Sequence, residues 1–221
     1  ASADTLILEN DKDYKIFNQI NRIFPTDPFL ILAYKVKNNK IDIEYLNNIN
    51  NLKKKLDKLN GIKSTFSIID APILLDTELS LSELNSEKIK TLNSKDVNID
   101  TALEELKNSP IFSDQIINKK GNVTAIIAYL EEDNKFIEVS QKRNELKNKI
   151  NKDSNVLKTD QLKEINKEYE TLKDNYNKNR HSLIKEIRLI INDPIFENNI
   201  FLGGIAMIAD DSLEFVKKDI I

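Results

Sequence analysis

The chain contains one histidine, His181, which is the first side chain to consider for acid–base catalysis or metal binding. It lies in a charged stretch between Arg180 and Ser182. A single histidine cannot form a His pair, and no Ser or Asp stands at a spacing that marks a Ser/His/Asp set. We therefore interpret His181 as a solvated helix residue, not as a general base or a metal ligand.

The glycine pair Gly203–Gly204 and the acidic pair Asp210–Asp211 are the next residues that could bind a ligand. A phosphate-binding loop needs glycines at other spacings or a following Lys-Ser/Thr, and neither is present. Gly203–Gly204 instead indicates a close backbone approach or a bulge in a strand. Asp210–Asp211 has the chemistry of a metal pair, but adjacent acids at a helix start are more typical of caps.

Carboxylates and lysines are abundant but are not grouped by spacing. The 36 acidic residues include the run 131–133, which indicates a solvated turn. The lysine runs 53–55, 119–120 and 217–218 lie in different elements among acids, and we interpret them as solvated faces. Nucleic-acid binding is not expected at a formal net charge of −3. No catalytic, cofactor-binding or metal-binding residue is assigned, no cofactor is expected, and substrate-binding or partner-binding residues stay open.

Composition indicates a folded chain without cysteine chemistry. The 221 residues are 40% hydrophobic and 31% charged, which suits a real core. The absence of cysteine excludes disulfides, thiolate metal sites and cysteine nucleophiles. The longest apolar run, residues 200–209, is shorter than the about 18 residues of a membrane span.

Apolar spacing and turn residues divide the chain into helices and strands. The expected helices lie at 11–24, from an Asp42 cap to a stop at Asn60–Gly61, at 99–108, and from a capping box at 211–214 onward. The expected strands lie at 29–36, 62–69, 114–118, 123–130 and 199–209, with a hairpin turn at 119–122. Residues 73–98 show no clean period and predict an irregular excursion.

The region 135–192 predicts two long helices. Apolar and long side chains step by three and four residues in two series: Val139, Arg143, Leu146, Ile150, and then Leu162, Ile165, Tyr169, Leu172, Tyr176. A break at 151–160 separates them, with a tip near 153–155. Two narrow seams with charged flanks favour an antiparallel, coiled-coil-like hairpin. Whether this hairpin projects from the rest of the chain or packs against it stays open.

Without this hairpin, the expected order is strand, helix, strand, strand, helix, strand. That order is typical of the split βαβ, ferredoxin-like arrangement. The prediction is therefore an α+β fold in a single domain, 1–221, with a core of about 11–135 and 183–221 and an inserted helical hairpin of about 136–182. The apolar end of the last helix further suggests a chain that continues beyond Ile221.

Five short segments follow one another in an order that a known family shares: INRIFPTDPFLIL at 20–32, LDKLNGIKSTFSII at 56–69, DAP at 70–72, GNVTAII at 121–127, and FLGGIAMIADD at 201–211, which continues to Lys218–Asp219. Together they resemble the extracytoplasmic domain of the resistance–nodulation–division (RND) superfamily, in its MMPL-like branch. The insertion from about 138 to 182 departs from the family, which has a single helix there.

The resemblance implies a non-catalytic, porter-type domain between the first and second membrane helices of a bacterial inner-membrane exporter. Such exporters are driven by a proton or sodium gradient, and their ion-relay residues lie in membrane helices. The expected location is the periplasmic side of that membrane. The implied partners are the rest of the transporter chain with its second periplasmic domain, other periplasmic subunits through the hairpin, and a hydrophobic or lipid-like substrate.

Two alternatives from other functional classes stay open. A free-standing coiled-coil adaptor would grip a partner with the hairpin and lose it when 144–170 is deleted. An enzyme on an α+β scaffold would show a pocket with convergent carboxylates or tyrosines and a strongly shifted pKa. A fold by itself does not decide among these functions.

Overall fold

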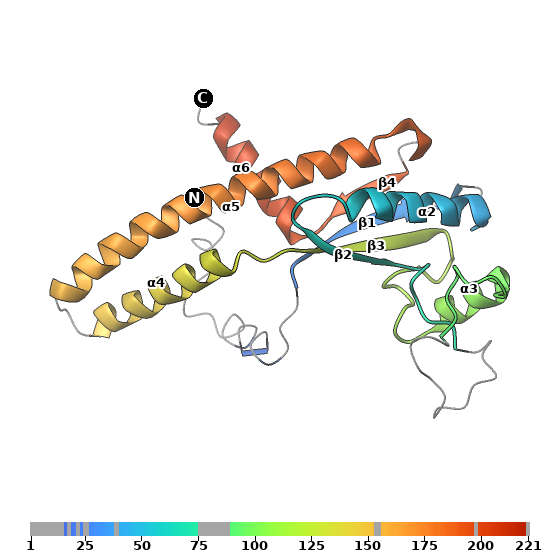
Figure 1. The fold of residues 1–221 in the computed structure, drawn as a ribbon, viewed down its shortest axis with the longest axis horizontal. Coiled ribbons are helices and arrows are strands. Elements are labelled where there is room, and N and C mark those ends of the chain that lie inside the picture. The colour runs from blue at the N-terminus through green and yellow to red at the C-terminus, as the bar shows by residue number, and fades with distance from the viewer. Residues whose placement is uncertain are drawn as a thin grey trace. The chain divides into compact units, whose positions relative to one another are not determined.

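The chain folds into α-helices and one four-stranded antiparallel sheet, so the predicted α+β class is confirmed (Figure 1). The structure is a computed structural model that describes residues 16, 19, 20, 23, 27–37, 40–74, 89–152, 156–196 and 199–219. Its elements in chain order are β1 (Phe29–Lys35), α2 (Ile43–Leu56), β2 (Ile62–Ser67), α3 (Ile99–Asn108), β3 (Val123–Leu130), α4 (Asn134–Lys152), α5 (Val156–Ile191), the 3-10 turn η4 (Pro194–Phe196), β4 (Ile200–Gly203) and α6 (Ile205–Asp219).

The chain divides into two compact units. The sheet unit comprises Phe29–Leu130 and Glu186–Ala209, and the hairpin unit comprises Ala1–Pro28, Glu131–Lys185 and Asp210–Ile221. All four strands belong to the sheet unit. The described residues of the predicted insertion, 136–152 and 156–182, lie wholly within the hairpin unit.

The sheet has the order β2-β3-β1-β4, and every neighbouring pair is antiparallel. Because β3 lies between β1 and β2 and opposes both, β1 and β2 run parallel to each other. By the same reasoning β3 and β4 run parallel with β1 between them. The register places Leu32 opposite both Ile126 and Leu202.

One sheet face forms the core of the sheet unit. Alternate side chains of a strand point to opposite faces, and the buried set in β1 and β3 includes Leu30, Leu32, Ile126, Ala128 and Leu130. Four apolar side chains of α2 at helical spacing are also buried, namely Leu46, Ile49, Leu52 and Leu56. Tyr45 of α2 contacts Tyr34 of β1 with ring centroids 4.6 Å apart, so α2 covers this face.

Local sequence signals account for α2 and α3. The Asp42 carboxylate accepts a hydrogen bond from the Tyr45 backbone N–H at 2.9 Å, which confirms the predicted N-cap. Asn98 caps α3 in the same way, and the bounds of α3 match the predicted 99–108. The helix α2 ends at Leu56, earlier than predicted, and Gly61 then supplies a positive φ of 92° in the turn into β2.

The predicted strand at 114–118 is wrong. Within it only Ile117 forms isolated bridges, to Ser113 and Thr124, and residues 114–116 are turn. Asp114 has a φ of 60°, which an extended strand cannot contain. Residues 123–130 form β3 as predicted.

The predicted strand at 199–209 is also wrong beyond Gly203, because α6 begins at Ile205. Gly204 has a φ of 124° and ends β4. The Ile208 N–H donates to the Gly204 carbonyl at 3.1 Å and closes the first helical turn. The predicted capping box at 211–214, with Asp210–Asp211 as caps, therefore lies inside α6 and opens no helix.

The two long helices α4 and α5 are antiparallel. As the residue number rises from Glu131 through α4, the number of the partner in α5 falls. The contacts are Glu131 with Arg180, Phe136 with Tyr176, and Arg143 with Asn166. The predicted break at 151–160 is wrong from Val156 onward, where α5 begins.

Three predictions fall wholly or largely outside the described residues: the helix at 11–24, the middle of the excursion at 73–98, and the hairpin tip at 153–155. No helix in the described part of the chain has the length and apolarity needed to cross a membrane.

Candidate functional site

The second face of the sheet is apolar and partly exposed. Phe29 and Ile31 of β1 and Phe201 of β4 are 44%, 36% and 60% exposed, whereas Leu30 and Leu32 between them are fully buried. The register places Ile31 opposite Ile127 and Gly203, and Ala33 opposite Ala125 and Phe201. We call this set, with Tyr129 opposite Phe29, the open sheet face. Large exposed apolar patches mark interaction surfaces, so it is the main candidate surface of the sheet unit.

Gly204 lets β4 end against β1. A Cβ atom at Gly204 would lie 3.1 Å from the Phe29 carbonyl oxygen and 3.3 Å from the Leu30 Cα, and its φ of 124° disfavours any side chain. A Cβ at Gly203 would meet only the Ile31 carbonyl oxygen, at 3.9 Å. The close backbone approach predicted for this pair is therefore confirmed, and it belongs to Gly204.

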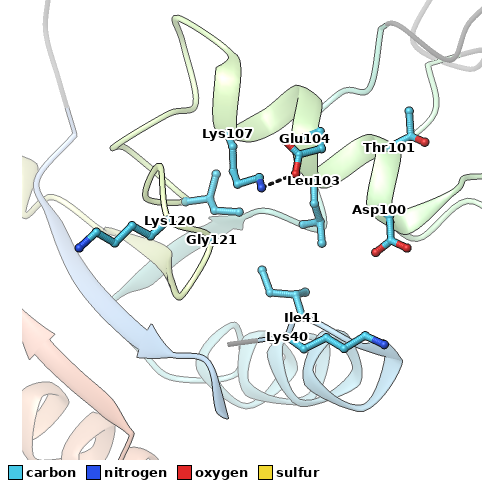
Figure 2. A pocket seen from close by; sticks show the side chains of 10 residues that line it. Lys40, Ile41, Asp100, Thr101, Leu103, Glu104, Lys107, Lys120 and Gly121 are labelled. Carbon is cyan, nitrogen blue, oxygen red and sulfur yellow. Dashed lines mark hydrogen bonds and ion pairs between the residues drawn. The ribbon is translucent and has the colours of Figure 1, made fainter. Parts of the chain in front are cut away.

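A pocket of about 530 Å³ lies in the sheet unit near α3 (Figure 2). Its wall includes the apolar Ile41, Leu103 and Ile117 and the charged Lys40, Asp100, Glu104, Lys107 and Lys120. Lys107 is already paired with Glu104 at 2.5 Å. Figure 2 shows the amino groups of Lys40 and Lys120 on opposite sides of the pocket, so its charges do not converge on one point.

His181 is exposed on α5, as predicted, but it also has a partner that was not predicted. Its Nδ1 lies 3.1 Å from both carboxylate oxygens of Asp210, a buried residue of α6 in the same hairpin unit. A carboxylate at Nδ1 holds the imidazole in one orientation. Nothing in the local sequence marks this pair, because the two residues are 29 positions apart. His181 and Asp210 do not line the pocket of Figure 2.

The lysine run 53–55 is not a uniform solvated face. Lys53 is buried and forms an ion pair with Asp70, which also accepts from the Ser67 N–H at 2.8 Å. Lys55 pairs with Asp193 at 2.9 Å, whereas Lys54 is exposed. Helical periodicity explains the split, because consecutive residues of a helix point in directions about 100° apart.

The other charged runs are closer to their predictions. Lys119 and Lys218 are exposed and form the surface pairs Lys119–Asp114 and Lys218–Glu214. Glu131 and Glu132 are exposed as predicted for a solvated turn. Asp133 has a further role, because its carboxylate accepts from the Phe136 N–H at 3.0 Å at the start of α4.

An aromatic cluster joins α4 and α5. The Phe136 ring stacks on Tyr169 and Tyr176, with centroids 5.6 and 5.0 Å apart. The Arg143 guanidinium lies 4.2 Å from the centroid of Tyr169 and donates to Asn166 at 2.7 Å. The predicted seam residues Arg143, Tyr169 and Tyr176 thus take part, and Phe136 is the member that the seam pattern missed.

Among the described residues Tyr45 has the strongest pKa shift, and the role of this side chain is structural. Its hydroxyl donates to the Tyr34 carbonyl at 2.8 Å and is hydrogen-bonded to the Thr124 hydroxyl at 2.7 Å. Burial raises the pKa of the Tyr45 phenol far above its ordinary value. The side chain is in the core of the sheet unit and does not line the pocket of Figure 2.

Within the described residues, no group of three or more His, Asp or Glu side chains is arranged to hold a metal ion. No protein-family model, curated protein or solved structure matches this chain.

Proposed function

We propose that this chain is a non-catalytic, porter-type domain of an RND-type exporter on the periplasmic side of the bacterial inner membrane. In this role it shapes a substrate path and binds neighbouring parts of the transporter. The resemblance of the five ordered sequence segments motivates the proposal. The strand order β2-β3-β1-β4 is the structural observation that carries it.

The strand order supports a split βαβ, ferredoxin-like fold. Two βαβ units are interleaved in that fold, so the parallel strands of each unit are separated by one strand of the other. β1-α2-β2 is the first such unit, with β3 between its strands. β3 and β4 bracket β1 in the same way, and the connection between them contains α4 and α5.

The α4–α5 hairpin supports two parts of the proposal, namely a helical insertion in the domain and contacts with partner subunits. The α4–α5 contacts at Arg143 and Tyr169 follow the seam expected for an antiparallel coiled coil, and Phe136 adds a ring contact outside that seam. Two long helices, α4 and α5, thus connect β3 to β4 where the ferredoxin-like fold has a single crossover helix. We assign this hairpin to contacts with other periplasmic subunits.

The open sheet face supports a role in substrate transfer. Its exposed Phe29, Ile31 and Phe201 suit a hydrophobic or lipid-like substrate, or an apolar surface of the second periplasmic domain. The ion-relay residues of such an exporter lie in membrane helices, so the proposal assigns none to this chain and assigns the chain no cofactor.

The two alternatives make different demands on the observed features. The adaptor requires the hairpin alone and gives no role to the open sheet face. The enzyme requires its shifted group in a pocket, whereas Tyr45 is enclosed by the core and Glu104 is paired with Lys107. Both observations favour the transporter domain.

Cysteine labelling tests the proposal, since the chain has no cysteine of its own. Asn144→Cys in the hairpin and Lys119→Cys in the sheet unit introduce thiols at exposed positions of the full-length natural protein. A membrane-impermeant maleimide added to intact cells should label both variants in the membrane fraction, and the parent protein is the control. Labelling only after lysis, or recovery in the soluble fraction, would contradict the proposal; the second result would favour the adaptor.

A further inference from the structure

A second pocket of the sheet unit lies along α2, and the polar residues described in its lining are lysines and asparagines. Its volume is about 370 Å³. The lining residues are Asn48, Asn51, Lys54, Lys55, Lys58, Ile195 and Phe196. None of these described lining residues carries a carboxylate, unlike the pocket of Figure 2, where Asp100 and Glu104 stand among the lysines.

The lysines of this region differ in how far they are already neutralised. Lys53 points away from the pocket and pairs with Asp70. Lys55 is held by Asp193 at 2.9 Å, and this hydrogen bond lowers the pKa of the Asp193 carboxyl. Lys54 and Lys58 are exposed, and the ammonium group of neither makes an ion pair or hydrogen bond with any residue in the described ranges.

The two asparagines extend the same donor surface. Asn48, Asn51 and Lys55 step by three and four residues, so they lie on one side of α2, and Lys58 follows in the turn just after the helix ends. The carboxamides of Asn48 and Asn51 likewise make no hydrogen bond to described residues. Two unneutralised ammonium groups and two amide donors therefore line one concavity, which suits a multiply charged oxyanion.

We propose that this pocket, which we call the lysine–asparagine pocket, binds a phosphate group. The ligand is either free phosphate or a phosphodiester headgroup of an anionic lipid, since the recognised chemistry is the same. Ile195 is 57% exposed at the pocket wall and offers an apolar surface to an organic substituent of the phosphate. The inference is independent of the transporter assignment, because it rests on the lining side chains alone.

The test follows amide and asparagine side-chain NMR signals of the 221-residue chain during titration. One arm uses inorganic phosphate, with sodium chloride of equal ionic strength as the reference. The other arm measures co-sedimentation with vesicles of phosphatidylglycerol and phosphatidylcholine, with pure phosphatidylcholine vesicles as the reference. Saturable shifts at Asn48, Asn51, Lys54 and Lys58, or retention on the anionic vesicles, would support the site, and the responding arm identifies the source.

Two charge-matched variants make the test specific. Lys54→Gln/Lys58→Gln should weaken binding by about tenfold or more, because it removes both unneutralised ammonium groups. Lys119→Gln/Lys120→Gln removes the same charge elsewhere on the sheet unit and should leave binding unchanged. An equal loss in both variants would mean unspecific attraction and would overturn the proposal. So would the absence of saturable binding in both arms.

Discussion

Tyr45 ties α2 to the sheet by hydrogen bonds. Its hydroxyl reaches the Tyr34 carbonyl and the Thr124 hydroxyl, and all three residues are buried. A buried polar group without its partner costs more than the hydrogen bond contributes when it is made. The sequence pattern assigned α2 only its aliphatic core positions, so this polar contact at its first turn was not predicted.

Tyr45→Phe should lower the free energy of unfolding by about 1–2 kcal/mol, since it leaves the Thr124 hydroxyl without this partner. Urea denaturation followed by circular dichroism measures the change. Tyr129→Phe on the open sheet face is the control and should change the midpoint little. A variant as stable as the parent chain would contradict the role given to the Tyr45 hydroxyl.

Alkaline pH should remove the advantage of the parent chain over Tyr45→Phe. Burial raises the pKa of folded Tyr45, so the folded chain keeps its proton while the unfolded chain loses one above about pH 10. The stabilisation by neutral Tyr45 is complete below that pH. It then falls by about 1.4 kcal/mol for each further pH unit. Denaturation of both proteins at pH 8 and pH 11 measures this; a constant difference would refute it.

At the scale of elements, the junction of β4 and α6 depends on one glycine. A strand and a helix meet at Gly204 without an intervening loop, in a conformation with φ of 124°. The apolar run 200–209 carried no periodicity that separates the strand from the helix. The positive φ and the contact with β1 determine where β4 stops.

Gly204→Ala should therefore destabilise the chain by about 1–3 kcal/mol, through backbone strain and the approach to Phe29 and Leu30. Gly203→Ala is the matched control and should cost less than about 1 kcal/mol, because its Cβ would be in ordinary contact. Thermal unfolding of the two variants side by side gives the comparison. Equal losses would show that the Gly204 conformation carries no special cost.

At the scale of the whole molecule, the division into two units predicts that the sheet folds without the outer hairpin. Replacing 147–163 by a short glycine-rich turn retains the Arg143–Asn166 bond and the aromatic cluster. Hydrogen exchange of the β1 and β3 amides should then stay as slow as in the parent chain. As control, the α4 amides next to the cut should exchange faster. Loss of protection in β1 and β3 would mean that the units fold as one.

Local sequence signals allowed most helices and strands to be predicted, and the wrong prediction of a strand at 114–118 has a local cause. Asp42 and Asn98 are caps whose effect extends over only the first helical turn, so α2 and α3 could be located from the sequence. The strand at 114–118 failed because Asp114 takes a left-handed φ, which its residue type permits but does not require. The contacts of Tyr45, Lys53 and His181 were not predicted, because each depends on a partner in another segment.

The sequence by itself determined the α+β class, the two long helices and the apolar faces that must be covered, since periodicity and capping act over a few residues. Only the tertiary structure decided the strand order, the pairing of Lys53 with Asp70 and of His181 with Asp210, and the gathering of donors in the lysine–asparagine pocket. These features join residues that are 17, 29 and more positions apart. Such contacts depend on how the segments pack, which no local pattern records.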